Sequence, residues 1–186
     1  MDVIRNSISR IAVITCAIVS VLTIGSFTSL VLAQSTKPIS VKIVDKAKYD
    51  EAISAYKGKV VVVDCWATWC VPCRKAFPKT VELAKTYASQ NVVVVSLSFD
   101  EPVKGQVPAG VTKFLTDSNA KFENLISSLD ISGDGADAFE IPDGALPHFK
   151  IYGKDGKLFK AFESRDGKEI KHEEIEAAVK QAIKNN

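Results

Sequence analysis

The stretch "VVVVDCWATWCVPCRKAFP", residues 60–78, decides the fold of this chain. It opens with four valines, and an apolar run of this kind is typical of a strand that is covered on both faces. Asp64 directly follows the valines, and Cys70 and Cys73 come shortly after it. The stretch therefore predicts a buried strand that ends at an acidic residue and leads into a Cys-x-x-Cys motif.

A helix is expected to begin at Cys70 and to run to about Ser89, and Pro78 should bend it. The unpaired N–H groups and the dipole at a helix N-terminus stabilise an anion, so the thiolate of Cys70 is favoured. A thiolate is the nucleophile in disulfide exchange, and Cys73, one turn later, can resolve the mixed disulfide. Pro72 is tolerated between them because it lies in the first helical turn.

Three other interpretations of the cysteine pair stay open at this point. A purely structural disulfide would gain little, because the closed loop is very short. A zinc site needs further ligands, and only His148 and His172 remain, at unsuitable spacing. A Cu(I) metallochaperone that uses Cys70, Cys73 and His148 is chemically sensible, since soft thiolates select Cu(I). Redox exchange is the interpretation that the spacing favours.

The chain on either side of this stretch alternates between strand-like and helix-like segments. The order of the main elements, β-α-β-α-β-β-α, predicts an α/β fold with a central mixed β-sheet flanked by helices. Strands are predicted over 39–44, 60–63, 91–99, 122–126, 149–152 and 157–162, and helical segments over 46–57, 70–89, 111–116, 136–139 and 168–184.

Residues 1–33 differ from the rest of the chain. Arg5 and Arg10 give this segment a positive start, and residues 11–33 carry no charge. The segment ends in Val-Leu-Ala, which suits a cleavage site. The pattern indicates a signal peptide or a retained membrane anchor, because about 20 uncharged residues can span a bilayer. Residues 34–40 are expected to form a linker and 41–186 the folded domain. Either way, the domain is expected to be exported, to the periplasm or the extracytoplasmic face of the membrane.

Composition limits the partners that this chain can have. Its 186 residues suffice for one domain with an export or linker segment. The net charge of +2 gives no electrostatic reason to expect binding to nucleic acid or to an anionic membrane. Contact with a membrane is expected only through the N-terminal segment. The 4 cysteines are too few for a disulfide scaffold.

The motif "WATWCVPC", Trp66–Cys73, resembles the active site of thioredoxin-fold proteins, and more narrowly of the exported TlpA/ResA-like thiol–disulfide oxidoreductases. The similarity extends over about residues 40–185. It implies a thioredoxin-like fold, protein thiols and disulfides as partners, and no cofactor besides a redox-active Cys70–Cys73 disulfide. The Val71-Pro72 dipeptide resembles that of reductive members, which act on apocytochromes or copper-centre assembly proteins in cytochrome c biogenesis and related pathways. A reductant of this class would need a membrane electron donor.

The same resemblance implies a role for each catalytic residue. Cys70 would attack, Cys73 would resolve, and Asp64 would exchange a proton with Cys73, because burial raises a carboxyl pKa toward the range of thiol chemistry. Two positions depart from the pattern. ResA-like members usually carry a glutamate where this chain has Ala76, and thioredoxins carry a lysine that would fall near Ser96.

A second proline, Pro147, stands at the start of a predicted strand. The resemblance implies that it follows a cis peptide bond and packs against the cysteine pair. Leu146 would then offer backbone groups to an extended substrate segment. Trp69, Val71 and Pro72 complete the predicted substrate-binding surface, with Trp69 as an apolar rim.

Three further residues that could take part in chemistry receive structural interpretations. Cys65 is expected to be a buried, inert packing residue. His148 is expected to be a partly exposed strand residue rather than a proton donor or a ligand, and His172 a surface residue on the last helix.

Overall fold

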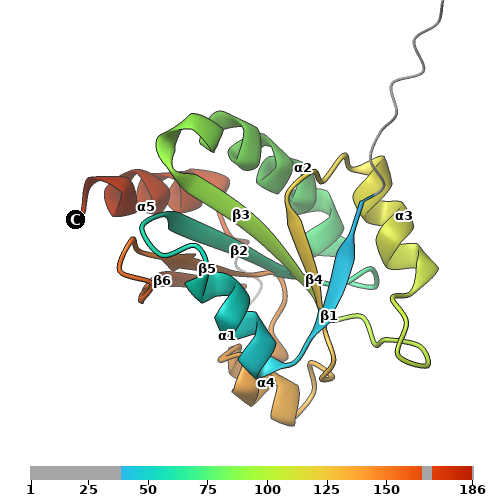
Figure 1. Ribbon diagram of the computed structural model, residues 1–186. Helices are drawn as coiled ribbons and strands as arrows, with labels where there is room; N and C mark the ends of the chain where they lie inside the picture. The colour runs from blue at the N-terminus through green and yellow to red at the C-terminus, as the bar shows by residue number, and fades with distance from the viewer. Residues whose placement is uncertain (1–38, 165–168, 186) are drawn as a thin grey trace, which may run out of the picture. The chain divides into compact units, whose positions relative to one another are not determined.

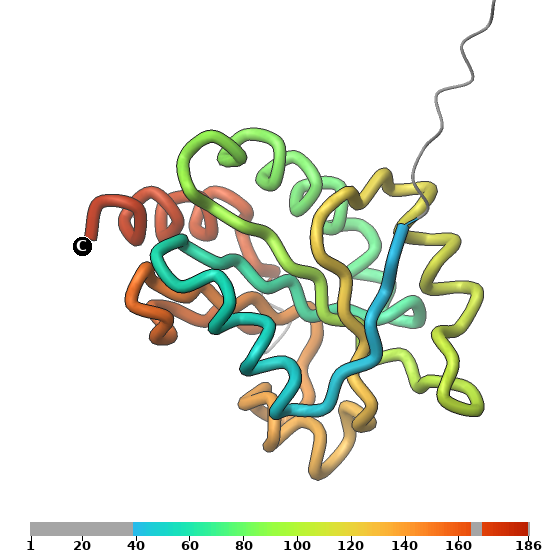
Figure 2. The backbone as a smooth tube through the Cα atoms, in the orientation of Figure 1, coloured from blue at the N-terminus to red at the C-terminus, as the bar shows by residue number. Residues whose placement is uncertain are grey.

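The computed structural model describes residues 39–164 and 169–185 (Figures 1 and 2). The predicted signal peptide or anchor, and most of the predicted linker, lie outside these residues. Among the helices of the described ranges, none is long and apolar enough to span a membrane.

In the described residues, the strands form a single 6-stranded sheet. They are β1 (Val41–Val44), β2 (Val60–Trp66), β3 (Val92–Ser98), β4 (Glu123–Ser127), β5 (His148–Tyr152) and β6 (Leu158–Glu163). Their order is β1-β4-β3-β2-β5-β6. The four strands β1, β4, β3 and β2 run parallel, while β5 is antiparallel to β2 and β6 to β5. The predicted mixed α/β sheet is therefore confirmed.

Helices cover both faces of this sheet (Figure 1). They are α1 (Lys46–Ser54), α2 (Val71–Thr86), α3 (Ala109–Asp117), α4 (Asp134–Ala138) and α5 (His172–Lys184), with short 3₁₀ turns η1 (Ala88–Gln90) and η2 (Pro142–Gly144). Side chains of α1 pack against Val61 and Val63 of β2. Side chains of α2 and α5 pack against Val60 and Val62. Because successive strand residues point to opposite faces, β2 is buried from both sides.

β2 is longer than the predicted strand 60–63. Asp64, Cys65 and Trp66 continue its parallel pairing, opposite residues 96–98 of β3. All residues of β2 are buried. The charge of Asp64 argued against a strand at that position, but the ladder on both sides of β2 outweighs the low strand propensity of one residue. As a result, the carboxyl group is carried into the interior of the protein.

Helix boundaries also differ from the predictions, and α1 and α5 are the clearest cases. α1 ends at Ser54 rather than at residue 57, because the chain tightens into a 3₁₀-like turn there. Tyr56 N–H donates to the Ile53 carbonyl at 3.0 Å, and Lys57 N–H donates to the Ser54 carbonyl at 3.1 Å. α5 begins at His172, later than the predicted start at 168. α2 runs through its internal proline without interruption.

The short helix α4 is packed closely against the chain that precedes it. A Cβ atom at Gly135 would lie 1.7 Å from the backbone oxygen of Asp130, far inside contact distance. The buried Lys150 of β5 ties the end of this region to the sheet, since its Nζ donates to the Phe139 carbonyl at 2.5 Å. Glycine is therefore required at position 135 because a side chain would clash with the backbone of Asp130, and not because of the backbone conformation.

Substitution of this glycine tests the packing of α4. Gly135→Ala is expected to lower the free energy of unfolding by about 1–3 kcal/mol, because the added methyl must displace backbone. Gly110→Ala in α3 is the matched control, because a Cβ atom there meets nothing within 4 Å. The control should leave stability unchanged or raise it by up to about 1 kcal/mol. Denaturant unfolding of both variants measures the difference, and equal effects would contradict the described packing.

Candidate active site

The turn between β2 and α2 is held by one buried carboxylate, that of Asp100. Its Oδ2 accepts a hydrogen bond from the Thr68 backbone N–H at 2.9 Å, and its Oδ1 accepts one from the Thr68 hydroxyl. The Ser98 hydroxyl also donates to Oδ2, at 2.7 Å. Asp100 follows β3, so these bonds fasten the turn to the neighbouring strand. They fix the position from which Cys70 enters the helix.

Cys70 and Cys73 form a disulfide at the start of α2. Cys70 is the N-cap of the helix, and the Cys73 backbone N–H donates to its Sγ at 3.3 Å. Both cysteines are almost buried, whereas Trp69 and Val71 are 58% and 50% exposed. When the pair is reduced, this helix terminus stabilises negative charge on the Cys70 sulfur, with exposed apolar side chains on either side.

Asp64 is buried in β2 on the face that α2 covers. The Thr80 hydroxyl of α2 donates to Oδ2 of Asp64 at 2.5 Å. Burial raises the pKa of the Asp64 carboxyl to about 7, and the hydrogen bond from Thr80 opposes part of this rise. Ser96 pairs with Asp64 in the parallel register, near the position where a thioredoxin lysine was expected. A carboxyl with this pKa can accept and return a proton near neutral pH.

Thr80 is a site residue that the sequence analysis did not identify. Cys73, Phe77 and Thr80 recur at the spacing i, i+4 and i+7, and all three are buried on the same face of α2. That spacing was the available signal, since a hydroxyl on the helix face that carries Cys73 must point toward β2. Asp100 and Thr68 were missed as well, and no local pattern connects two residues so far apart in sequence.

A groove beside the disulfide brings together several predicted substrate-binding residues. A cavity of about 350 Å³ is lined by Val71 and Pro72 from α2 and by Pro147 from the loop before β5. The expected cis peptide bond between Leu146 and Pro147 is confirmed. Leu146 packs against the core cluster that contains both cysteines. These four residues therefore lie around one end of α2.

The groove has further lining residues that the sequence analysis did not name, among them the charged Lys75 and Glu169. Lys75 of α2 and Ile170, which precedes α5, also line the cavity of about 350 Å³. Trp69 does not line this cavity. Its side chain is exposed, and it directly precedes Cys70 in the sequence. An extended segment bound in the groove would therefore meet apolar side chains together with one lysine and one glutamate.

The expectation for His148 was wrong, because its side chain is buried. His148 pairs with Cys65 in the antiparallel register between β5 and β2, and directly opposed residues share one face of a sheet. Cys65 packs in the cluster that α1 covers, whereas Cys70 and Cys73 belong to the cluster on the α2 face.

His148 therefore does not join the cysteine pair as a third copper ligand. The described residues contain no group of three side chains arranged to hold a metal ion. Burial, with a smaller contribution from the positive charge of Lys150, lowers the pKa of His148 to about 4. Both of its ring nitrogens lack a hydrogen-bond partner among the described residues. The imidazole is neutral at physiological pH.

Cys65 is buried, as expected, and it is the free cysteine of the described residues. Burial raises the pKa of its thiol to about 12, although the charge of Lys150 opposes this. A thiol that does not ionise near neutral pH is a poor nucleophile. Cys65 is therefore unreactive in the folded protein.

A mixed sheet of this topology, with a Cys-x-x-Cys disulfide at the N-terminus of the helix after its central strand, defines a thioredoxin-fold protein. The model of the AhpC/TSA family matches residues 35–161. The chain belongs to this family.

Two similar proteins are named as thiol-disulfide oxidoreductases. The chain is 29% identical over 124 residues to the thiol-disulfide oxidoreductase ResA of Geobacillus kaustophilus, a match that covers 67% of this chain and 65% of that protein. It is 30% identical over 108 residues to ResA of Bacillus subtilis, covering 58% of this chain and 55% of the relative. The match thus spans between about half and two thirds of the length of these relatives.

Solved structures support the fold. A thiol:disulfide interchange protein of the thioredoxin family from Chlorobium tepidum superposes with a TM-score of 0.53 at 21% identity, covering 70% of this chain and 83% of its own. A secreted Mycobacterium tuberculosis disulfide oxidoreductase homologous to DsbE superposes with a TM-score of 0.52 at 21% identity, covering 69% and 85%. The identities are low, so these likenesses establish the architecture alone.

Burial of Asp64 should make stability depend on pH. An unfolded aspartate has a pKa of about 3.9, so between about pH 4 and pH 7 the folded protein holds a proton that the unfolded chain has released. Stability therefore falls as the pH rises through this window. Asp64→Asn should be more stable than the wild type at pH 8, by up to about 4 kcal/mol, and similar to it at pH 4. Chemical unfolding at the two pH values measures this, and a pH-independent difference would contradict the buried carboxyl.

Removal of the Thr80 hydroxyl should raise the pKa of Asp64 further. The bond from Thr80 stabilises the ionised carboxylate, so Thr80→Val is expected to move the Asp64 midpoint above about 7. Thr80→Ser keeps the hydroxyl and serves as the control. Carboxyl ¹³C chemical shifts recorded against pH measure the midpoint in both variants. An unchanged midpoint in Thr80→Val would show that the hydroxyl does not act on Asp64.

Proposed function

We propose that this protein is a thiol–disulfide oxidoreductase that reduces disulfides of partner proteins outside the cytoplasm. The observation that carries the proposal is the Cys70 sulfur at the N-terminus of α2, bonded to Cys73 and receiving its backbone N–H. Membership of the AhpC/TSA family and the names of the ResA relatives support the same chemistry. The redox group is the cysteine pair itself, and no cofactor is required.

The first step is attack by the reduced enzyme. The Cys70 thiolate attacks one sulfur of a partner disulfide, and a bond forms between Cys70 and the partner. The partner's second sulfur leaves as a thiolate, which takes up a proton. The helix N-terminus lowers the free energy of the attacking thiolate, so the step proceeds near neutral pH.

The second step is resolution by Cys73. Its thiol gives a proton to Asp64, whose pKa of about 7 suits this exchange. The Cys73 thiolate attacks the Cys70 sulfur, the mixed disulfide breaks, and the bonded partner sulfur leaves as a thiolate. Two electrons have then passed to the partner, and the enzyme holds the Cys70–Cys73 disulfide that the structure contains.

The partner is expected to bind as an extended segment. The groove lined by Val71, Pro72 and Pro147 lies beside the disulfide, and Leu146 would supply backbone hydrogen bonds to the bound segment. The exposed side chain of Trp69, next to Cys70 in sequence, would offer an apolar rim. This arrangement favours unfolded or flexible partner chains, because a disulfide in a compact domain cannot enter a groove of this size.

Export and a membrane electron donor complete the proposal. The uncharged segment 11–33 suits a signal peptide or an anchor, and an exported disulfide reductant must receive electrons from the membrane side. The Val-Pro dipeptide between the cysteines supports a reductive rather than an oxidative role, by its resemblance to reductants of the TlpA class.

Trapping of the mixed disulfide tests the activity. Cys73→Ser should accumulate a covalent complex with a disulfide-bonded protein such as insulin, and Cys70→Ala should abolish both trapping and insulin reduction. Cys65→Ala is the matched control and should keep full activity, because its thiol is buried and protonated. If Cys73→Ser forms no covalent complex, the proposed exchange reaction is wrong.

The direction of electron flow is tested separately. The reduction potential of the Cys70–Cys73 couple, measured against glutathione, should lie near about −270 mV for a reductant. A value near about −120 mV would assign the protein to the oxidants while leaving the exchange chemistry intact.

A further inference from the structure

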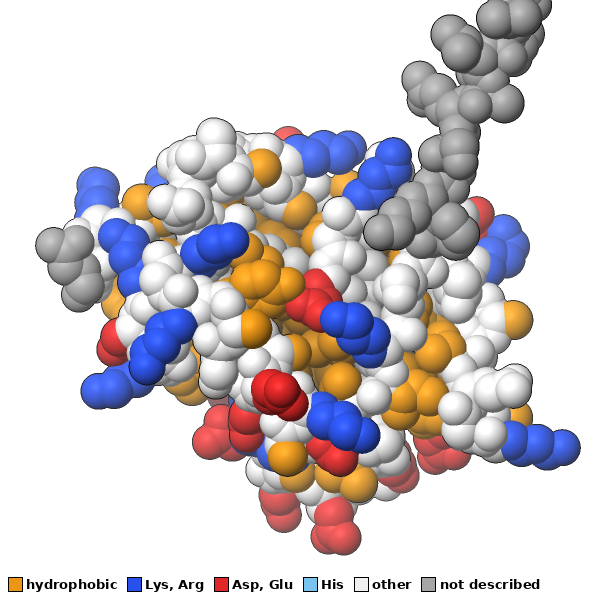
Figure 3. Space-filling view, viewed as in Figure 1, with side chains coloured by type: hydrophobic (Ala, Val, Ile, Leu, Met, Phe, Trp, Pro, Cys, Tyr) orange, Lys and Arg blue, Asp and Glu red, His pale blue; other side chains and the backbone are white. Residues whose placement is uncertain are grey.

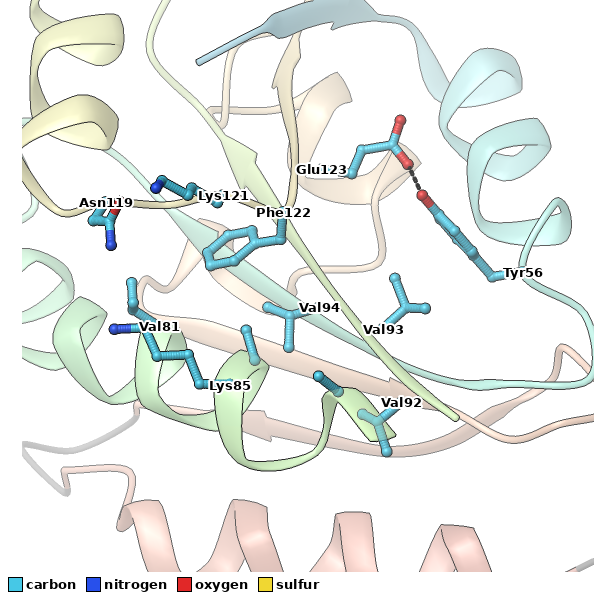
Figure 4. A pocket seen from close by; sticks show the side chains of 12 residues that line it. Tyr56, Val81, Lys85, Val92, Val93, Val94, Asn119, Lys121, Phe122 and Glu123 are labelled. Atoms are coloured by element: carbon cyan, nitrogen blue, oxygen red, sulfur yellow. Dashed lines mark hydrogen bonds between the residues drawn. The ribbon is translucent and has the colours of Figure 1, made fainter. Parts of the chain in front are cut away.

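A second hollow lies along the C-terminal half of α2, whose N-terminus carries the cysteine pair. It has a volume of about 480 Å³, and its lining comes from α2, β3, the segment before β4 and the turn after α1 (Figure 4). Apolar side chains are open to the surface over β3 on this face of the molecule (Figure 3). Val81, the lining residue of α2 that is nearest to Cys70 in sequence, follows it by 11 residues, or about 16 Å along the helix. We name it the β3-edge groove.

The β3-edge groove lies along a part of β3 that has a strand on one side only. β2 pairs with β3 from Val92 onward. β4 pairs with β3 only from Val95 onward. The segment Val92–Val94 thus has β2 as its neighbour on one side and the groove on the other. An unpaired strand edge of this kind is a template for an added strand.

The lining itself shows that the groove opens onto this edge. Val92 and Val94 belong to the core cluster on the α2 face, and Val93 packs against the cluster on the α1 face. All three nevertheless line the same hollow. Consecutive strand residues point to opposite faces, so one cavity can contact all three only from the edge of the strand.

At least one backbone donor points into this edge. Val60 N–H of β2 donates to the carbonyl of Asn91 at 3.0 Å, so that carbonyl points toward β2. In a trans peptide the N–H of the next residue points the opposite way. The N–H of Val92 is therefore directed away from β2, toward the side on which the described residues place no strand.

The charges around the groove are unequal. Lys85, Asn119 and Lys121 lie along one side of it (Figure 4). Neither lysine has a hydrogen bond or ion pair with another side chain of the described ranges, so both charges are available. On the other side, Glu123 accepts a hydrogen bond from Lys42 at 2.8 Å and another from Tyr56 (Figure 4). The carboxylate is paired with a lysine outside the groove, so the two lining lysines give the groove an excess of positive charge.

We propose that the β3-edge groove binds an extended, acidic peptide segment of a partner protein, which pairs with Val92–Val94 as an additional strand. Backbone hydrogen bonds to the strand edge would supply orientation, and alternate apolar side chains would contact the valines and Phe122. Acidic side chains of the segment would meet Lys85 and Lys121.

This interaction does not depend on the proposed redox activity. The groove is lined by the C-terminal half of α2 and by neither cysteine, so a bound segment leaves Cys70 accessible and needs no cysteine of its own. A partner held in this way would stay associated through repeated cycles of disulfide exchange. The free strand edge favours a peptide over an acidic lipid, which has no backbone to pair.

The test uses the full chain and a blocked synthetic peptide, Glu-Val-Thr-Val-Glu, at low ionic strength, because salt screens exposed charges. Amide chemical shifts in NMR spectra should change at Val92–Val94 and not around Cys70. The double variant Lys85→Glu with Lys121→Glu should bind this peptide about tenfold more weakly. The same variant should bind a Lys-Val-Thr-Val-Lys peptide more tightly than the wild type does.

Matched controls separate the groove from net charge. Lys104→Glu with Lys184→Glu changes the net charge equally at exposed positions outside the groove and should bind like the wild type. All variants should reduce insulin normally, so a failure of the proposed function would be visible apart from this result. The proposal is overturned if the peptide causes no shifts at Val92–Val94, or if both double variants weaken binding equally. It is also overturned if dodecanoate, used as the acidic lipid, produces these shifts and the peptide does not.

Discussion

The candidate active site depends on the position of one sulfur atom. Cys70 is the N-cap of α2, and its Sγ accepts a hydrogen bond from the backbone N–H of Cys73. The turn between β2 and α2 positions this contact, and the hydrogen bonds that Thr68 donates to Asp100 hold that turn. The central place of β2 in the sheet follows from its valine run, which is buried on both faces. The sheet is thus the support that aims a helix N-terminus at a reactive sulfur.

The buried carboxyl of Asp64 lowers stability when it ionises, and in the proposed mechanism it supplies the proton acceptor. Asp64 lies in the interior, where desolvation raises its pKa to about 7, and Thr80 gives it a hydrogen bond in place of the lysine that thioredoxins carry. An isosteric amide would be easier to bury but could not take a proton from Cys73. We interpret this unfavourable burial as a functional feature, since strain of this type persists where the surrounding structure enforces it.

Much of the fold and the core of the site could be predicted because the signals are local. The valine run, the Cys-x-x-Cys spacing and the proline at 147 each act within a few residues, and the structure agrees with the elements that they predict. The rest depends on register. His148 was expected to be partly exposed, but its pairing with Cys65 directs it to the face that α1 covers. The β3-edge groove exists because β4 begins its pairing late, which no periodicity reveals.

The central claim is that the N-terminus of α2 stabilises a thiolate on Cys70, and the pKa of that thiol in the reduced protein tests it most directly. The pH dependence of the rate of Cys70 alkylation by iodoacetamide measures this pKa, with Cys73→Ser as the background that leaves Cys70 as the one reactive thiol among residues 39–164 and 169–185. The structure predicts a midpoint well below the value of about 8.5 for free cysteine. A midpoint at or above about 8.5 would contradict the account, because the helix would then give the sulfur no electrostatic advantage.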